Sequence, residues 1–289
     1  MLKGSIVALV TPFQENGDID FNRLKELIEF HIENKTDGIL VLGTTGESPT
    51  LTHEEDEAVV KFTIKQVNKR IPVIVGAGSN CTRTSLIYSK KYAELGADAL
   101  LVISPYYNKA NYEGMKQHFL TVADNVDIPL ILYNIPGRTG CSISVELLKE
   151  LSQHKNIIGI KEASGDISYA SKVATLLNDN FVMYSGNDDI VVAMLALGAS
   201  GVISAAANII PNEMHNICEA FFNNDVETAR RIQLKYLNLI NALFIEVNPI
   251  PIKAAMALNN MSVGGYRLPL CEISENAKEV LIKAMEVLK

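Results

Sequence analysis

Short apolar runs recur along the chain and alternate with stretches of helical periodicity. Several runs are continuous and β-branched, such as I-L-V-L at 39–42 and V-I-V at 73–75. Runs of this kind are typical of parallel strands that are covered on both faces. We predict eight strands: Ser5–Val10, Gly38–Gly43, Pro72–Ala77, Ala97–Ser104, Pro129–Asn134, Ile157–Glu162, Phe181–Gly186 and Ser200–Ala205.

Helical patterns fill the gaps between these strands. Asp20 precedes apolar positions at helical spacing, namely Phe21, Leu24, Ile28 and Ile32. Thr52 and Glu55 form a T-x-x-E capping box that opens the next helix. Strand–helix alternation eight times over predicts a (β/α)8 TIM barrel, which we favour over a doubly wound open sheet with as many strands.

The alternation stops after the eighth strand, and the remainder is predicted to be helical. From Asp225 onward, apolar positions keep a three-to-four spacing: Ala229, Ile232, Tyr236, Ile240, Leu243 and Val247. N-P-I-P at 248–251 breaks this pattern, and a last amphipathic helix covers about 274–288. We therefore predict a catalytic barrel over 1–224 and a C-terminal helical extension over 225–289, which packs on the barrel or makes a subunit contact.

Composition and charge exclude several classes of protein. The chain has 289 residues, 48% of them hydrophobic, so it can bury a large core. A net charge of -7 and the lack of any Lys/Arg-rich run argue against nucleic-acid binding. No apolar stretch approaches the ~20 residues that cross a bilayer, so we expect no membrane association.

The N-terminus and the cysteines indicate where the protein works. The apolar segment before Pro12 has no small-residue cleavage site, so we interpret it as a strand and not as a signal peptide. Four cysteines lie far apart without C-x-x-C spacing: Cys81, Cys141, Cys218 and Cys271. Unpaired thiols are expected in a reducing compartment, which predicts a cytoplasmic protein.

Chemically versatile residues gather where the predicted strands end, and barrel enzymes place their working residues at the carboxyl ends of strands. The relevant segments are G-T-T-G-E (43–47), S-P-Y-Y-N (104–108), Y-N-I-P-G-R-T-G (133–140), I-K-E-A-S-G-D (160–166), Y-S-G-N-D-D (184–189) and V-I-S-A-A-A-N (202–208).

Lys161 ends an apolar strand that points into the predicted barrel. Burial disfavours its ammonium form. A neutral amine attacks a ketone, and the resulting iminium withdraws electrons so that an enamine can form. The alternative is a salt bridge with Glu162, but adjacent strand residues point to opposite faces, which makes that pairing poor. We predict that Lys161 is a nucleophile.

Other strand-end residues have both a chemical and a structural interpretation. Tyr133 could exchange a proton beside an imine, or could be a packing residue with a solvated hydroxyl. Thr44 and Thr45 could hold a carboxylate or cap a turn. Arg138 matches a carboxylate bidentately, or is a surface arginine. The Tyr106–Tyr107 pair predicts an exposed interface.

The sequence has no complete motif for binding a nucleotide or a metal ion. G-A-G-S-N-C at 76–81 lacks the third glycine of a dinucleotide fingerprint, and no Walker A loop occurs. The histidines have no metal-ligand spacing: His31, His53, His118, His154 and His215. We expect no metal and no organic cofactor.

The strand-end motifs together resemble the dihydrodipicolinate synthase and N-acetylneuraminate lyase family over nearly the whole chain. The resemblance depends on G-T-T-G-E, Y-N-I-P-G-R-T-G, I-K-E-A-S-G and N-P-I-P-I-K at 248–253, which occur in the family's order. It implies a (β/α)8 barrel with a C-terminal helical region, in agreement with the periodicity.

The resemblance also implies a role for each residue. Lys161 would form a Schiff base with pyruvate, and Tyr133, Thr44 and Tyr107 would form a proton relay. Thr45 would bind pyruvate, and Arg138 would bind the carboxylate of L-aspartate 4-semialdehyde. Gly186 and Ile203 would make backbone contacts near the imine.

Oligomerisation is part of what the resemblance implies. Tyr107 would reach the relay of a partner subunit, so the active unit would be a homodimer at minimum, and a homotetramer is expected.

Two alternatives remain from the sequence. A sister aldolase would cleave N-acetylneuraminate or a 2-keto-3-deoxy sugar acid with the same lysine, but such lyases usually lack an arginine at the position of Arg138. A non-catalytic, pyruvate-binding regulatory barrel is disfavoured because Lys161, Tyr133, Thr44 and Tyr107 are all retained.

Some family members are inhibited by lysine bound at the dimer interface. The matching allosteric positions Ser48, His53, Asn80 and Tyr106 are retained. Two further positions differ, since Asp56 and Thr84 stand where inhibited members usually carry His and Glu. Loss of the glutamate removes a carboxylate able to pair with the effector's ammonium. We predict weak or absent inhibition by L-lysine.

Overall fold

The computed structural model describes residues 2–289, so only the first residue of the predicted domain 1–224 lies outside it. The strands are β1 (Gly4–Ala8), β2 (Gly38–Val41), β3 (Val73–Gly76), β4 (Ala99–Ile103), β5 (Leu130–Asn134), β6 (Ile157–Glu162), β7 (Val182–Ser185) and β8 (Gly201–Ser204). They lie within or close to the predicted segments and form one closed parallel barrel in chain order. The predicted fold class is confirmed.

The helices alternate with these strands as the periodicity predicted. They are α1 (Phe21–Glu33), α2 (His53–Val67), α3 (Thr82–Leu95), α4 (Tyr112–Ala123), α5 (Pro136–Thr139), α6 (Val145–Leu151), α7 (Ile167–Ala174), α8 (Val191–Ala196), α9 (Pro211–Phe222), α10 (Val226–Ala242), α11 (Ile250–Leu258) and α12 (Glu275–Ala284). Short 3₁₀ turns occur at η1 (Ser48–Thr50), η2 (Asp188–Ile190), η3 (Ala206–Asn208) and η4 (Met285–Leu288). No helix of residues 2–289 has the length and apolarity to span a bilayer.

Local capping chemistry sets two of the predicted helix starts. Asp20 accepts a hydrogen bond from the backbone N–H of Arg23 at the start of α1. Thr52 and Glu55 form the complete reciprocal capping box of α2. Both interactions join residues three positions apart, which is why the sequence alone could predict them.

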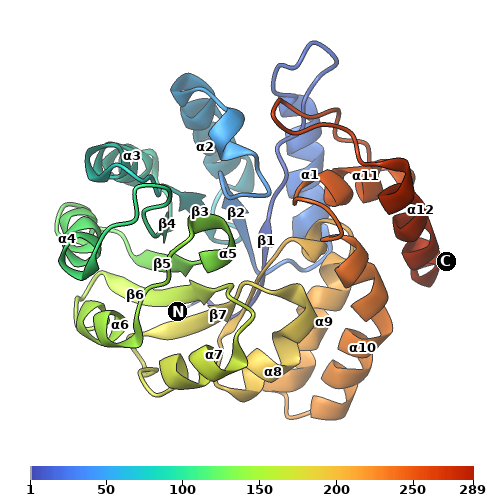
Figure 1. Ribbon diagram of the computed structural model, residues 1–289. Coiled ribbons are helices and arrows are strands. Elements are labelled where there is room, and N and C mark those ends of the chain that lie inside the picture. The colour runs from blue at the N-terminus through green and yellow to red at the C-terminus, as the bar shows by residue number, and fades with distance from the viewer. Residues whose placement is uncertain (1) are drawn as a thin grey trace.

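Figure 1 shows the strands at the centre, inside a ring of helices. Side chains of alternate strand residues fill the barrel interior, including Ile6, Leu40, Ile74, Leu101 and Ile131. The larger apolar core lies between the sheet and the helices. The barrel closes where β1 pairs with β8 at Gly4 and Gly201. A Cβ on Gly201 would lie 1.9 Å from the Gly4 carbonyl oxygen, so this seam requires glycine.

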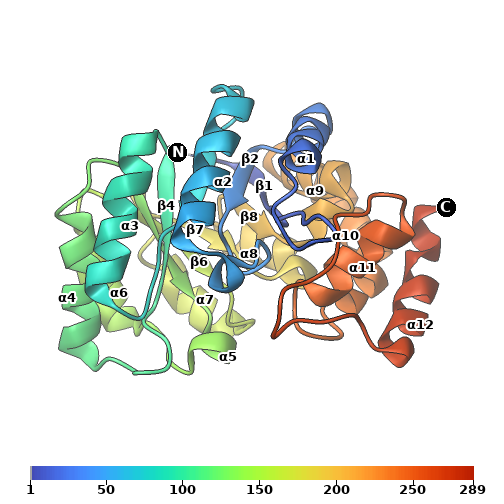
Figure 2. The ribbon, with the colours of Figure 1, turned by 90° about the horizontal axis from the view of Figure 1, so that it is seen from above.

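The C-terminal extension lies on one side of the barrel. In Figure 1 and in Figure 2, α11 and α12 stand beside α1, on the side away from α3 and α4. One detail of the prediction is wrong: α10 ends at Ala242, although the apolar spacing continued to Val247. Residues 243–249 form turns and bends between α10 and α11.

Candidate active site

Lys161 and Tyr133 lie side by side inside the barrel. The two residues are paired in the parallel register of β5 and β6, so their side chains leave the sheet on the same face. Both are 6% exposed, and the Lys161 Nζ lies 4.5 Å from the centre of the Tyr133 ring. Lys161 makes no ion pair within residues 2–289, in contrast to the buried Lys253, whose Nζ lies 2.8 Å from Glu47 Oε1.

Glu162 points to the other face of β6 and is not the partner of Lys161. Its Oε2 accepts a hydrogen bond from Asn134 Nδ2 at 2.7 Å, and its Oε1 accepts one from the Ser164 N–H at 2.6 Å. Burial raises the pKa of this carboxyl, and the bonds from Ser164 and Asn134 oppose that shift. The salt bridge considered as an alternative for Lys161 is therefore absent.

A cavity of about 160 Å³ surrounds the lysine. Its lining includes every predicted catalytic or substrate-binding residue except Tyr107: Thr44, Thr45, Tyr133, Arg138, Lys161, Gly186 and Ile203. These residues follow or end five different strands, yet the carboxyl ends of parallel strands bring them to one face of the barrel.

Thr45 and Arg138 are both tied to one residue of the C-terminal extension. Asn248 Nδ2 donates to Thr45 Oγ1 at 2.9 Å, and the Asn248 carbonyl accepts from Arg138 Nη2 at 3.0 Å. The Asn248 Oδ1 atom is buried without a hydrogen-bond partner, and the residue lines the cavity. The side chain of Arg138 remains exposed, so its guanidinium has free donors for an anion.

Gly186 lines the cavity at a position where no larger residue fits. A Cβ at this position would lie 2.5 Å from the Ala163 Cβ. The Gly186 N–H donates to the Glu162 carbonyl at 2.6 Å, which leaves its own carbonyl group for other contacts. The side chain of Ile203 belongs to the apolar filling of the barrel interior.

Tyr107 does not reach the cavity within one chain. Its side chain is 89% exposed, and its φ of 70° lies in the left-handed region. The neighbouring Tyr106 is 36% exposed, and an interface at this pair stays a prediction. A contact between Tyr107 and the relay of a second copy stays a prediction.

The predicted allosteric residues surround a second, wider cavity of about 490 Å³. Ser48, His53 and Tyr106 line it, together with Asp56 and Thr84. This cavity also reaches the catalytic side, since its lining includes Thr44, Tyr133 and Arg138.

Asn80 is the allosteric position that does not line this cavity. Its carbonyl accepts a hydrogen bond from Asn108 Nδ2 at 2.9 Å. Lysine binding by these positions stays a prediction.

Asp56 is a buried acid at the edge of the wider cavity. It is 5% exposed, and its Oδ1 has no hydrogen-bond partner among residues 2–289. Burial, with a smaller effect of the Glu55 charge, raises the pKa of Asp56 to about 7. From the sequence we expected Asp56 to be an anion, whereas its pKa in the structure lies close to neutral pH.

Two residues near the site were not singled out from the sequence. Asp188 is fully enclosed, and its Oδ2 accepts from the N–H groups of Ala205 and Ala206 at 3.1 and 3.0 Å. Burial raises the pKa of this carboxyl, while hydrogen bonds from Ser204 and from the Ala206 and Ala205 N–H groups oppose that shift. Asn248 is the second residue that was not singled out. Asp188 lies in the motif G-N-D-D and Asn248 in N-P-I-P-I-K, and these two motifs, which both follow apolar segments, were the available signal.

All four cysteines are free thiols, as the sequence predicted. Within residues 2–289, no group of three or more His, Cys, Asp or Glu side chains is arranged to hold a metal ion.

Comparisons with known proteins agree with this arrangement. The model of the dihydrodipicolinate synthetase family matches residues 1–288. The 4-hydroxy-tetrahydrodipicolinate synthase of Clostridium perfringens is 51% identical over 281 residues, which cover 97% of this chain and 96% of the relative.

Solved structures give the same result. The dihydrodipicolinate synthase of Aquifex aeolicus is 44% identical with a TM-score of 0.96, covering 98% of this chain and 97% of that chain. The chloride-inhibited enzyme of Acinetobacter baumannii, complexed with pyruvate, is 42% identical with a TM-score of 0.97, covering 99% of each chain.

Proposed function

The chain belongs to the dihydrodipicolinate synthetase family, and we infer from this membership that it is a lyase with the activity of 4-hydroxy-tetrahydrodipicolinate synthase. This activity condenses pyruvate with L-aspartate 4-semialdehyde in the diaminopimelate and lysine biosynthesis pathway. The observation that carries the proposal is Lys161, a buried lysine with no ion pair among residues 2–289, which lies beside Tyr133 in the 160 Å³ cavity.

The reaction starts at the Lys161 amine. Its neutral form attacks the ketone carbon of pyruvate, and the ketone oxygen leaves as water after protonation through Tyr133. The imine loses a methyl proton and becomes an enamine. Its methylene carbon attacks the aldehyde of aspartate semialdehyde, which forms the new carbon–carbon bond. The substrate's amine then attacks the imine carbon, closes the ring and frees Lys161.

We assign the remaining residues by their place around the cavity. Thr45 binds pyruvate, Thr44 passes protons between Tyr133 and solvent, and Gly186 and Ile203 contribute backbone groups near the imine. Arg138 holds the carboxylate of the semialdehyde, because guanidinium matches a carboxylate bidentately.

Assembly completes the proposal. Tyr107 of a second copy joins the relay, so we propose a homodimer as the minimum active unit and a homotetramer as the full assembly. We keep residues 225–289 as a C-terminal helical domain, and we place the protein in the cytoplasm, where its four free thiols stay reduced.

The sequence left two other functions open. Sugar-acid cleavage by a sister aldolase is set aside, because the chain carries Arg138 at the cavity and its curated relatives at about 50% identity are synthases. A non-catalytic barrel has no need for a buried lysine that lies beside a tyrosine and makes no ion pair within the described part of the chain.

One assay tests the proposal. The purified protein is incubated with pyruvate and L-aspartate 4-semialdehyde, and formation of the cyclic product is followed. N-acetylneuraminate and 2-keto-3-deoxygluconate are offered in parallel. Turnover with the first pair alone is expected, and cleavage of a sugar acid without condensation would overturn the assignment.

A further inference from the structure

The loop that carries Thr44 and Thr45 is held in a strained conformation. It lies between Leu42 and Glu47, and both of these residues have a φ of 56°. Residues other than glycine persist in the left-handed region only when the surrounding structure imposes it. The loop must therefore be anchored from outside.

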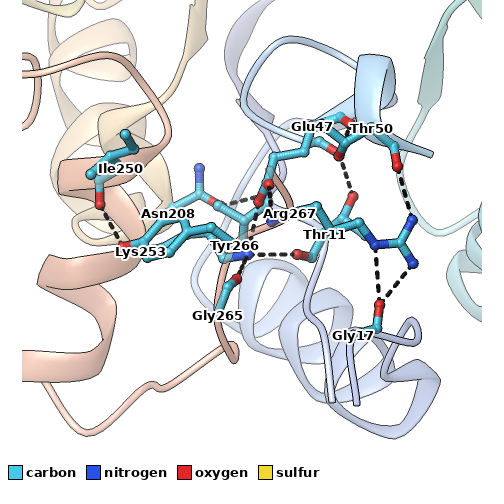
Figure 3. A network of polar contacts seen from close by, with 12 residues as sticks. Thr11, Gly17, Glu47, Thr50, Asn208, Ile250, Lys253, Gly265, Tyr266 and Arg267 are labelled. Atoms are coloured by element: carbon cyan, nitrogen blue, oxygen red, sulfur yellow. Dashed lines mark hydrogen bonds and ion pairs between the residues drawn. The ribbon is translucent and has the colours of Figure 1, made fainter. Parts of the chain in front are cut away.

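The anchor is a buried ion pair with the C-terminal extension (Figure 3). Lys253 of α11 donates from Nζ to Glu47 Oε1 at 2.8 Å, to the Gly265 carbonyl at 2.5 Å and to the Thr11 carbonyl at 3.3 Å. The lysine and glutamate side chains are 1% and 0% exposed. Three acceptors match the three protons of an ammonium group, so Lys253 is fully satisfied.

Aromatic rings and a second contact fix the position of this ammonium. The Lys253 Nζ lies 4.4 Å from the centre of the Phe13 ring and 5.2 Å from that of Tyr266. Thr11 also binds the loop directly, since its hydroxyl donates to the Gly46 carbonyl at 2.6 Å. The loop is thus held from two sides, by Lys253 of the extension and by Thr11 of the segment after β1.

A buried ion pair of this kind is weak evidence for stability, because apolar residues of similar volume often serve as well. Its distinct property is geometric. Charge-assisted hydrogen bonds specify one orientation, whereas apolar packing tolerates several. Glu47 is two residues from Thr45 in the chain, so holding its carboxylate in place restrains the loop that carries the threonines.

We propose that the Glu47–Lys253 ion pair is a positioning device for the reaction, through which the C-terminal extension holds Thr44 and Thr45 at the cavity. The proposal rests on the proposed function, because the two threonines matter to catalysis only there. Neither Glu47 nor Lys253 lines the cavity around Lys161. Both act through the loop.

The test combines Glu47→Gln with Lys253→Met, which removes both charges together and leaves no unpaired buried ion. Well below its melting temperature, the double variant is expected to lose roughly 10- to 100-fold in kcat, the effect of misplacing reacting groups by about 1 Å. The KM for pyruvate rises, while borohydride at saturating pyruvate still traps the adduct on Lys161. Amide hydrogens of residues 43–47 exchange faster than in the wild type.

Leu281→Ala is the matched control, since it removes a fully buried side chain of α12 outside the network. It is expected to lower the melting temperature and leave kcat unchanged. If the double variant does not fold, Lys253→Arg replaces it. Arginine keeps the charge but presents a planar guanidinium, so partial loss of kcat is expected.

Wild-type kcat and KM together with unchanged exchange at 43–47 would overturn the positioning role. Failure of the proposed function looks different, because the wild-type protein itself would then show no turnover. The exchange measurement needs no substrate and still decides whether the pair holds the loop.

Discussion

Lys161 and Tyr133 are direct neighbours across β5 and β6, with the lysine Nζ 4.5 Å from the centre of the tyrosine ring. The parallel register imposes this relationship, because paired residues project to the same face of the sheet. It places an amine and a phenol within one cavity without any contribution from a flexible loop. Both residues therefore have positions defined by the barrel itself.

The first prediction concerns the covalent intermediate. Borohydride reduces an iminium but leaves an unmodified lysine intact, so pyruvate and borohydride together should add a stable three-carbon adduct to Lys161 and abolish activity. Peptide mass mapping locates the adduct. Lys161→Ala should show none while its circular dichroism stays that of the wild type. An adduct on another lysine would refute the mechanism.

Tyr133→Phe tests proton transfer. The substitution removes the hydroxyl with little change of shape, so kcat should fall by roughly 10²- to 10⁴-fold, as is typical for loss of general acid–base catalysis. Pyruvate should still bind. Tyr184→Phe is the control, since the Tyr184 hydroxyl donates to the Leu2 carbonyl at 2.8 Å. Equal losses in both variants would assign the effect to packing.

Arg138→Ala should separate the two substrates. Loss of charge-assisted hydrogen bonds worth about 1.5–3 kcal/mol corresponds to a rise of roughly 10- to 100-fold in the KM for aspartate semialdehyde. The pyruvate adduct should form as in the wild type. Arg138→Lys keeps the charge without the bidentate geometry and should be intermediate. Unchanged kinetics with both substrates would show that Arg138 does not bind the semialdehyde.

L-Lysine should inhibit weakly or not at all. Thr84 supplies no carboxylate to the wider cavity, and the buried Asp56 is partly protonated at neutral pH, since its pKa is about 7. Allosteric coupling is typically about 1–3 kcal/mol, so loss of one ion pair removes most of it. Strong, saturable inhibition at sub-millimolar lysine would contradict this, and Asp56→Asn would then show whether Asp56 replaces the missing glutamate.

Asp56 should also make stability depend on pH. Folding raises its pKa from 3.8 to about 7, so its contribution is favourable below about pH 4 and is lost as the pH rises to 7. Asp56→Asn removes this loss. Its melting temperature should therefore exceed that of the wild type by more at pH 8 than at pH 5, with Asp127→Asn as an exposed control. A difference independent of pH would mean that Asp56 does not titrate in this range.

The sequence by itself determined the barrel and most of the candidate site. Hydrophobic periodicity is a local property, so it located the eight strands and the capped starts of α1 and α2. Side chains alternate between the two faces of a strand, which was enough to predict that Lys161 and Glu162 point to opposite faces of β6. Three of the family motifs end or follow β2, β5 and β6, so they place Thr44, Thr45, Tyr133, Arg138 and Lys161 at one face of the barrel.

Only the tertiary structure decided which distant residues hold that site in place. Glu47 and Lys253 are 206 positions apart, and Thr45 and Asn248 are 203 apart. No local pattern encodes such pairs, since they form only after the barrel closes and the extension packs against it. The same holds for Asp56, whose sequence suggests an ordinary anion but whose burial raises its pKa to about 7. Periodicity specifies the positions of the strands and helices, whereas burial and long-range contacts determine the partners and the pKa values of the polar residues.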